Sequence, residues 1–118
     1  MCRKASTNIL AGMIVSAIVL SFSAPAFAQD AAAAKSMARK SSCLRCHAVG
    51  KKKEGPSYQT IAYEYKGRGD AADVLVKHIT TGEDRVKLTD GHVELHKDIM
   101  GKESPESIRN LVAWILAQ

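Results

Sequence analysis

The chain contains 118 residues and carries a formal net charge of +5, from 17 basic and 12 acidic side chains. Two of the basic residues, Arg3 and Lys4, lie in a segment that we expect to be removed, which lowers the charge to +3. Such mild basicity excludes the strong positive excess typical of a nucleic-acid-binding domain. A chain of this length forms one small domain, and small exported domains often depend on a disulfide, a metal or a cofactor.

The first 28 residues have the pattern of a secretory signal peptide. The basic pair is followed by an apolar stretch from Ile9 to Leu20 and by the small-residue cleavage site Ala26-Phe27-Ala28. An uncleaved membrane anchor is the alternative, but serines and a proline interrupt the apolar stretch. We therefore predict a signal peptide at 1–28 and a single domain at 29–118. Export places the domain in the periplasm, with no membrane anchor after cleavage.

The first helix is predicted from Ala31 to about Cys46, with Asp30 as its N-cap. Its end carries the sequence C-x-x-C-H at residues 43–47. Two thiols at this spacing, on one turn of helix, can each add to one vinyl group of a haem, and the histidine then offers its imidazole to the iron. The pattern predicts one covalently attached haem c, held by Cys43 and Cys46, with His47 as the proximal iron ligand.

Two other kinds of site share part of this pattern. A structural zinc site needs four ligands, and the chain has no fourth cysteine. A thiol-disulfide enzyme places C-x-x-C after a buried strand of an α/β unit. Residues 35–42, rich in Lys, Arg and Ser, do not form such a strand, so both alternatives are disfavoured.

Three further helices are predicted after a turn at 51–56. The second runs from Pro56 through Tyr65, and the third from Ala71 to Thr80 between an Asp70 cap and a Gly82 stop. The last follows Ser104-Pro105 and has apolar residues at i, i+3, i+4 and i+7, which are Ile108, Leu111, Val112 and Ile115. No strand-like alternation is present, so the fold class is all-α. The segment from Gly82 to Glu103 has no clear period, and we expect a loop there that wraps a ligand.

Beyond the C-x-x-C-H motif, the chain contains Gly55-Pro56-Ser57-Tyr58 and the terminal run Leu111-Val112-Ala113-Trp114-Ile115-Leu116. With these features, residues 31–118 resemble the bacterial class I monohaem cytochromes c, close to the small pseudomonad type. The resemblance implies a small cytochrome c fold of about four helices wrapped around one covalently bound haem. It also implies that the terminal aromatic residue packs in the core against the first helix.

The resemblance also implies roles for individual residues around the haem. The Pro56 carbonyl is expected to accept a hydrogen bond from His47 and so to orient it. His78 lies where the family often has a basic group near a haem propionate, so a propionate contact is expected. His92 is expected to be a solvated side chain. Tyr58, Tyr63 and Tyr65 are either packing residues, which we favour, or haem contacts.

At the distal iron ligand the chain departs from the family pattern, because the family usually has a Met followed by Pro and Met100 is followed by Gly101. In the family the ligand commonly precedes the aromatic residue of the last helix by about 16 to 18 residues, as the resemblance implies. His96 precedes Trp114 by 18 residues and Met100 by 14. We predict His96 as the distal ligand and keep Met100 as the alternative. Two imidazoles give a lower reduction potential than an imidazole with a thioether.

The function implied by the resemblance is electron transfer, without enzymatic activity, by a monomer whose redox partners dock transiently at the exposed haem edge. Basic residues around the motif are expected to steer acidic partners, unless they are merely a solvated loop: Arg39, Lys40, Arg45, Lys51, Lys52 and Lys53. Two alternatives remain open. One is a haem subunit of a periplasmic oxidoreductase complex, and the other is a gas-binding haem protein with an open sixth position.

Overall fold

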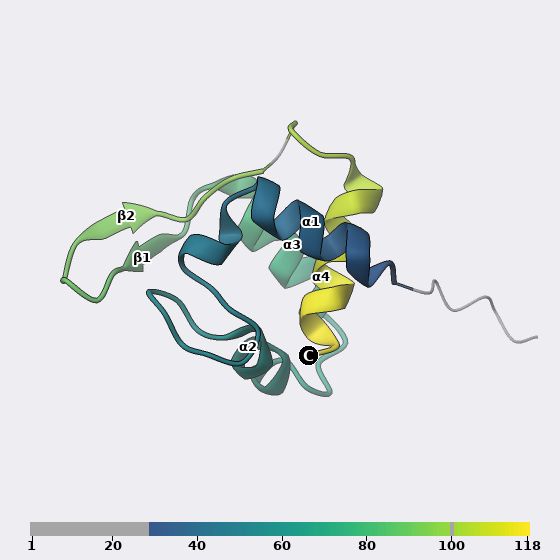
Figure 1. Ribbon diagram of the computed structural model, residues 1–118, viewed down its shortest axis with the longest axis horizontal. Helices are drawn as coiled ribbons and strands as arrows, with labels where there is room; N and C mark the ends of the chain where they lie inside the picture. Colours follow the sequence, from purple (N-terminus) through teal and green to yellow (C-terminus); the bar gives the residue numbers. More distant parts are fainter. Residues whose placement is uncertain (1–28, 100) are drawn as a thin grey trace, which may run out of the picture.

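The computed structural model describes residues 29–99 and 101–118, so the predicted signal peptide lies outside the described residues. Figure 1 shows a mostly helical molecule from which a two-stranded ribbon projects at one end. The predicted cytochrome c fold of about four helices is confirmed, with a small sheet in addition. The described elements are α1 (Ala31–Lys40), η1 (Cys43–Arg45, a 3₁₀ helix), α2 (Tyr58–Glu64), α3 (Ala71–Thr81), β1 (Arg85–Lys87), β2 (Val93–Leu95) and α4 (Pro105–Leu116). Within the described part of the chain, no helix has the length and apolarity needed to cross a membrane.

Helix α1 ends at Lys40, so the prediction of one helix reaching about Cys46 is wrong. The helix is closed by the backbone N–H of Ser41, which bonds to the Met37 carbonyl, and by that of Ser42, which bonds to the Arg39 carbonyl. Ser42 then adopts a left-handed conformation with φ 61°, which reverses the chain and cannot continue an α-helix. The C-x-x-C-H motif therefore begins on the separate short helix η1.

Helix α4 begins as predicted, after the Ser104 cap, whereas α2 begins at Tyr58, two residues after the predicted start at Pro56. Ser57 accepts a hydrogen bond from the backbone N–H of Thr60 at 3.0 Å, and Ser104 accepts one from Ser107 at 3.2 Å. Both caps satisfy backbone donors that a helix leaves without partners in its first turn. The four apolar residues predicted to face the core from α4 are all buried.

Helix α3 begins at Ala71, as predicted, and ends at Thr81, one residue after the predicted end. Gly82 adopts φ 62° at its C-terminus, a left-handed conformation that glycine takes readily. Asp70 occupies the N-cap position, yet its side chain makes no capping bond. Its carboxylate instead pairs with the Arg68 guanidinium at 2.8 Å, so the predicted Asp70 side-chain cap is wrong.

Strands β1 and β2 form an antiparallel hairpin within the segment predicted to be a structureless loop. The hairpin turn contains Asp90-Gly91, and Gly91 has φ 89°, as turns between paired strands often require. The N–H of Leu88 bonds to the His92 carbonyl at 2.8 Å and closes the turn. Each strand has only three residues, too short for a recognisable alternation of apolar and polar side chains, which explains the wrong prediction.

The core lies where α1 and α2 pack against α4. Trp114 is 3% exposed, as predicted for a core residue, and its ring meets the Tyr58 ring of α2 edge-on at 5.3 Å between centroids. The first turn of α1 is tied to α4 because Asn110 exchanges two hydrogen bonds with the backbone of Asp30, at 2.8 and 2.9 Å. Apolar residues of α4 also line a cavity that lies beside this core.

Candidate functional site

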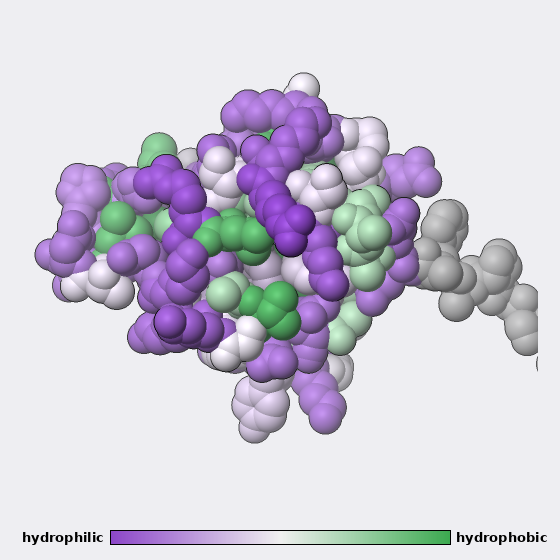
Figure 2. All heavy atoms as spheres, in the orientation of Figure 1, coloured by the Kyte–Doolittle hydropathy of each residue, from purple (hydrophilic) through white to green (hydrophobic). Residues whose placement is uncertain are grey.

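A cavity of about 1080 Å³ lies between η1, α3, α4 and the hairpin. Much of its wall is apolar, from residues that include Ile61, Leu75, Ile79, Ile99, Leu111 and Val112. Figure 2 shows hydrophobic residues gathered at the centre of one face of the molecule, bordered by hydrophilic residues of the surrounding segments. A large apolar cavity with a few polar groups is typical of a site for a bulky, mostly hydrophobic cofactor.

Both motif cysteines lie at the wall of this cavity, and neither is in a disulfide. Helix η1 sets their spacing, because the N–H groups of Cys46 and His47 both bond to the Cys43 carbonyl, at 3.2 and 3.0 Å. Burial raises the pKa of the Cys43 thiol, which disfavours the free thiolate. The motif therefore presents two thiols and an imidazole to one cavity.

His47 is held in one orientation by the segment that follows the turn. Its Nδ1 lies 2.7 Å from the Pro56 carbonyl oxygen. A carbonyl can only accept, so Nδ1 carries the proton and donates it, which leaves the lone pair of Nε2 available to a metal. Gly55 lies directly against the ring, since a Cβ built at Gly55 would be 2.6 Å from His47 Cε1. Only glycine leaves room for the imidazole here.

Tyr58 completes the surroundings of the proximal imidazole. Its ring stacks on that of His47, with centroids 5.6 Å apart and planes inclined by 14°. The side chain is 2% exposed, and its hydroxyl is buried without a hydrogen-bond partner. Burial, together with the nearby Cys43, raises the pKa of the phenol. Tyr58 is thus a packing residue that also borders the cavity, whereas Tyr63 is 79% exposed.

His96 also borders the cavity and lies directly after β2. Its ring centroid is 6.2 Å from that of His47. Two imidazoles that bind one metal from opposite sides, with metal–nitrogen distances of about 2 Å, have centroids about 6 Å apart. Nδ1 of His96 lies 3.1 Å from the Lys97 carbonyl oxygen, to which it donates, so Nε2 is again the nitrogen without a proton. The alternative, Met100, lies outside the described residues.

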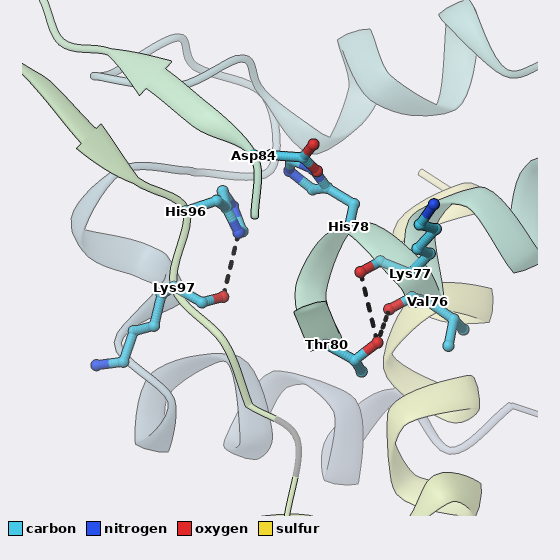
Figure 3. Close-up of polar contacts among 7 residues, drawn as sticks. All are labelled: Val76, Lys77, His78, Thr80, Asp84, His96 and Lys97. Carbon is cyan, nitrogen blue, oxygen red and sulfur yellow. Dashed lines mark hydrogen bonds and ion pairs between the residues drawn. The ribbon is translucent and has the colours of Figure 1, made fainter. Parts of the chain in front are cut away.

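His78 and Asp84 stand next to His96, as Figure 3 shows. The rings of His78 and His96 are 4.0 Å apart between centroids, and Nδ1 of His78 pairs with the Asp84 carboxylate. Burial lowers the pKa of His96, with smaller contributions from His78 and His47, which favours the neutral imidazole that can bind a metal. His92, predicted to be solvated, is exposed on the hairpin turn.

These residues fit a haem, as judged from the shape and chemistry of the site. The cavity is large and much of its wall is apolar, two thiols lie at that wall, and the imidazoles of His47 and His96, which both border it, have ring centroids 6.2 Å apart. A bound haem would find two thiols for covalent attachment here, and imidazoles that would be available to its iron. Among the described residues, His78 is the further imidazole that borders the same cavity.

Two features of the site were missed by reasoning from the sequence. One is the enclosure of the proximal imidazole: Gly55 was given no role, and Tyr58 was expected to be a packing residue, but its stacking on His47 was not predicted. The other is a contact across the cavity edge, where Thr89 of the hairpin turn donates to the Glu54 carboxylate. The two residues are 35 positions apart, and no local pattern connects them.

Comparison with known proteins agrees with this geometry. The family model described as Cytochrome c matches residues 31–118. Cytochrome c-551 from Pseudomonas denitrificans is 31% identical over 74 residues, which is 63% of this chain and 83% of that protein. Cytochrome c-552 from Hydrogenobacter thermophilus is 41% identical over 46 residues, but the alignment covers only 39% of this chain and 47% of that protein.

A solved structure is similar over most of its length. The class 1 cytochrome MtoD from Sideroxydans lithotrophicus ES-1 superposes with a TM-score of 0.73 at 53% sequence identity. The match covers 76% of this chain and 97% of the MtoD chain. The fold of this chain is therefore shared with a solved class 1 cytochrome.

Proposed function

This chain belongs to the cytochrome c family, and we propose that it is a periplasmic electron carrier with two protein ligands on its haem iron. The family binds haem c covalently, and Cys43, Cys46 and His47 form its attachment motif in this chain. When bound, the haem supplies an iron that alternates between the ferrous and ferric states. The relatives therefore imply haem-based electron transfer, and the protein determines how the haem is held, shielded and presented.

The placement of His47 and His96 is the observation that carries this proposal. Their rings are 6.2 Å apart across the cavity, and each has its Nδ1 engaged by a backbone carbonyl. If His47 and His96 both bound the iron, no position on it would be left for a substrate, which favours a carrier over an enzyme. Two imidazoles, in place of an imidazole and a thioether, favour a lower reduction potential.

The optical spectrum of the ferric protein tests the ligand set. We expect a low-spin spectrum without the weak band near ~695 nm that reports a bond between Met and ferric iron in haem proteins of this kind. We expect His96→Ala to become high-spin or to take up an external ligand, and Met100→Ala to remain low-spin. A band near ~695 nm that disappears in Met100→Ala would assign the distal position to Met100. A high-spin wild-type protein would contradict both assignments and favour a gas-binding protein.

Docking of partners at the haem edge is the second part of the proposal. Six basic residues proposed to steer acidic partners are all exposed: Arg39, Lys40, Arg45, Lys51, Lys52 and Lys53. Two of them already have internal contacts, because Lys40 pairs with Glu103 at 3.1 Å and Lys53 donates to the Leu44 carbonyl. If the remaining cations steer partners, electron-transfer rates with an acidic redox protein fall steeply as salt is added. Weak salt dependence would count against steering.

Location and assembly state can be measured on the native protein. We expect the mature chain to begin at Gln29 after export, with mass spectrometry showing one haem c per chain. Gel filtration of a native extract is expected to give a monomer. A stable larger species that contains this chain would favour the alternative of a haem subunit in a periplasmic oxidoreductase complex.

A further inference from the structure

One carboxylate oxygen connects the two sides of the cavity. Oε2 of Glu54 accepts a hydrogen bond from the backbone N–H of Thr89 at 2.8 Å and from the Thr89 hydroxyl at 2.7 Å. Glu54 belongs to the proximal loop, residues 51–57, and Thr89 to the turn of the hairpin. Glu54 borders the cavity, and so does Leu88, the residue before Thr89. The contact between Glu54 and Thr89, which we call the clasp, therefore lies at the edge of the cavity.

On the proximal side, the clasp is connected to His47 by a short path. The N–H of Gly55, next to Glu54, bonds to the Cys46 carbonyl at 2.8 Å. The following residue, Pro56, accepts the hydrogen bond from His47. A displacement of Glu54 is therefore transmitted through two neighbouring residues to the attachment motif and the proximal imidazole.

On the distal side, the clasp is connected to His96 through the hairpin. Thr89 is held in a turn closed by the bond between Leu88 and His92. Strand β2 runs from this turn to His96, whose own N–H bonds to the Asp84 carbonyl at 2.7 Å. The hairpin meets the body of the protein at its base, where Ile99 bonds to Ile79 of α3 at 3.0 Å. Without the clasp, the far end of the hairpin would lose two charge-assisted hydrogen bonds that hold it beside the proximal loop.

We propose that Glu54 is a positioning residue, whose carboxylate fastens the hairpin turn across the cavity edge and keeps the distal side of the haem site closed. The inference rests on the proposed function, because it presupposes a haem in the cavity. Loss of the clasp frees the hairpin to move about its base. The distal segment then leaves the iron more often, and small external ligands gain access to it.

The experiment compares Glu54→Ala with Glu83→Ala in the haem-loaded protein. Both substitutions remove one exposed carboxylate that borders the cavity, so each removes one negative charge from its lining. Imidazole is added to the ferric protein, and its binding rate is followed by the change in the optical spectrum. We expect binding about fivefold faster in Glu54→Ala than in the wild-type protein, and little change in Glu83→Ala. Equal rates in the two variants would overturn the proposal.

Hydrogen exchange provides a readout that does not depend on ligand binding. The Thr89 amide donates to Glu54, so its protection is expected to be lost in Glu54→Ala and retained in Glu83→Ala. A second pair covers the case in which Glu54→Ala does not fold. Thr89→Ser keeps both donors and is expected to behave as wild type, whereas Thr89→Val loses the hydroxyl and is expected to bind imidazole about twofold faster. Identical behaviour of Thr89→Val and Thr89→Ser in both measurements would contradict the clasp.

Failure of the clasp is distinguishable from failure of the proposed function. Reversible one-electron reduction of the wild-type protein tests the carrier function and involves none of these variants. If the wild type cycles reversibly while Glu54→Ala matches Glu83→Ala in imidazole binding and exchange, only the clasp is disproved. If the wild type does not cycle, the carrier function fails irrespective of how the variants behave.

Discussion

The proximal wall of the cavity, residues 43–58, is held by many short-range bonds, whereas the distal wall, residues 82–99, is attached mainly at the base and at the turn of the hairpin. Around His47, a glycine, a proline carbonyl and a tyrosine ring occupy three sides within eleven residues of chain. His96 instead follows a hairpin whose strands are largely exposed, with Val93 at 44% and Leu95 at 59%. The residues around His47 therefore fix the position of the proximal imidazole by local contacts. The position of His96 depends instead on how the hairpin is attached to the rest of the protein.

The strongest test of this difference is Gly55→Ala. The added methyl group would be 2.6 Å from His47 Cε1 and 3.0 Å from its Nδ1, so the imidazole or the loop has to move. We expect a loss of about 2–3 kcal/mol in the free energy of unfolding, as for other overpacked sites, with a shifted haem spectrum. Gly69→Ala is the matched control, because nothing lies within 4 Å of a Cβ there. Similar unfolding curves for both variants would show that the proximal wall is not rigid.

The distal counterpart is Gly82→Ala, at the base of the hairpin. Gly82 has φ 62°, and an added Cβ would be 3.0 Å from Cβ of Asp98. The left-handed conformation costs an alanine about 1 kcal/mol relative to glycine, so we expect a destabilisation of about that size or slightly more in chemical denaturation. We also expect faster binding of imidazole, because the base of the hairpin shifts. An effect as large as that of Gly55→Ala would remove the contrast between the two walls.

Tyr58→Phe separates stacking from hydrogen bonding on the proximal side. The hydroxyl has no hydrogen-bond partner in the protein, so its removal is expected to change the unfolding free energy of the haem-loaded protein by less than about 1 kcal/mol. Tyr58→Leu, which also removes the ring, is expected to cost about 2–4 kcal/mol. A large loss in Tyr58→Phe would reveal that the hydroxyl is hydrogen-bonded when haem is present.

The smallest expected effect is a pH dependence of the clasp. The two bonds from Thr89 lower the pKa of Glu54 below its ordinary value of 4.5. Their contribution to stability is therefore complete above that ordinary value and is lost as the pH falls through the lowered one. We expect the difference in thermal midpoint between wild type and Glu54→Gln to shrink between about pH 5 and pH 3. A difference that stays constant over this range would mean that the carboxylate charge is not involved.

Much of the proximal wall could be predicted from the sequence, because it is local. The C-x-x-C-H motif and the proline nine residues after its histidine lie within one short stretch, and the caps Ser57 and Ser104 are next to the helices they start. The early end of α1 was missed because Ser41-Ser42 contains neither glycine nor proline. A left-handed serine is uncommon, and residue type alone gives little sign of it.

The distal wall was harder to predict, because its structure depends on contacts between distant residues. Asp90-Gly91 indicates a turn, but strands of three residues show no period by themselves. His96 was singled out by its distance from Trp114 in a resembling family, not by any property of the hairpin. The position of Thr89 beside Glu54 follows only from the folded chain, since a bond over 35 residues leaves no local signal.

The pairing of β1 with β2 also limits how this part of the chain can vary in related sequences. Arg85 faces Leu95 and Lys87 faces Val93, and the bond from His96 to Asp84 continues this ladder by one residue. Insertions or deletions in the turn at 88–92 leave the facing residues unchanged if the strands keep their register. One extra residue between β2 and His96 would turn the imidazole to the opposite face of the hairpin, because side chains alternate along a strand. Related sequences that use the same histidine should therefore differ freely in turn length. Their histidine should follow β2 directly, as His96 does here.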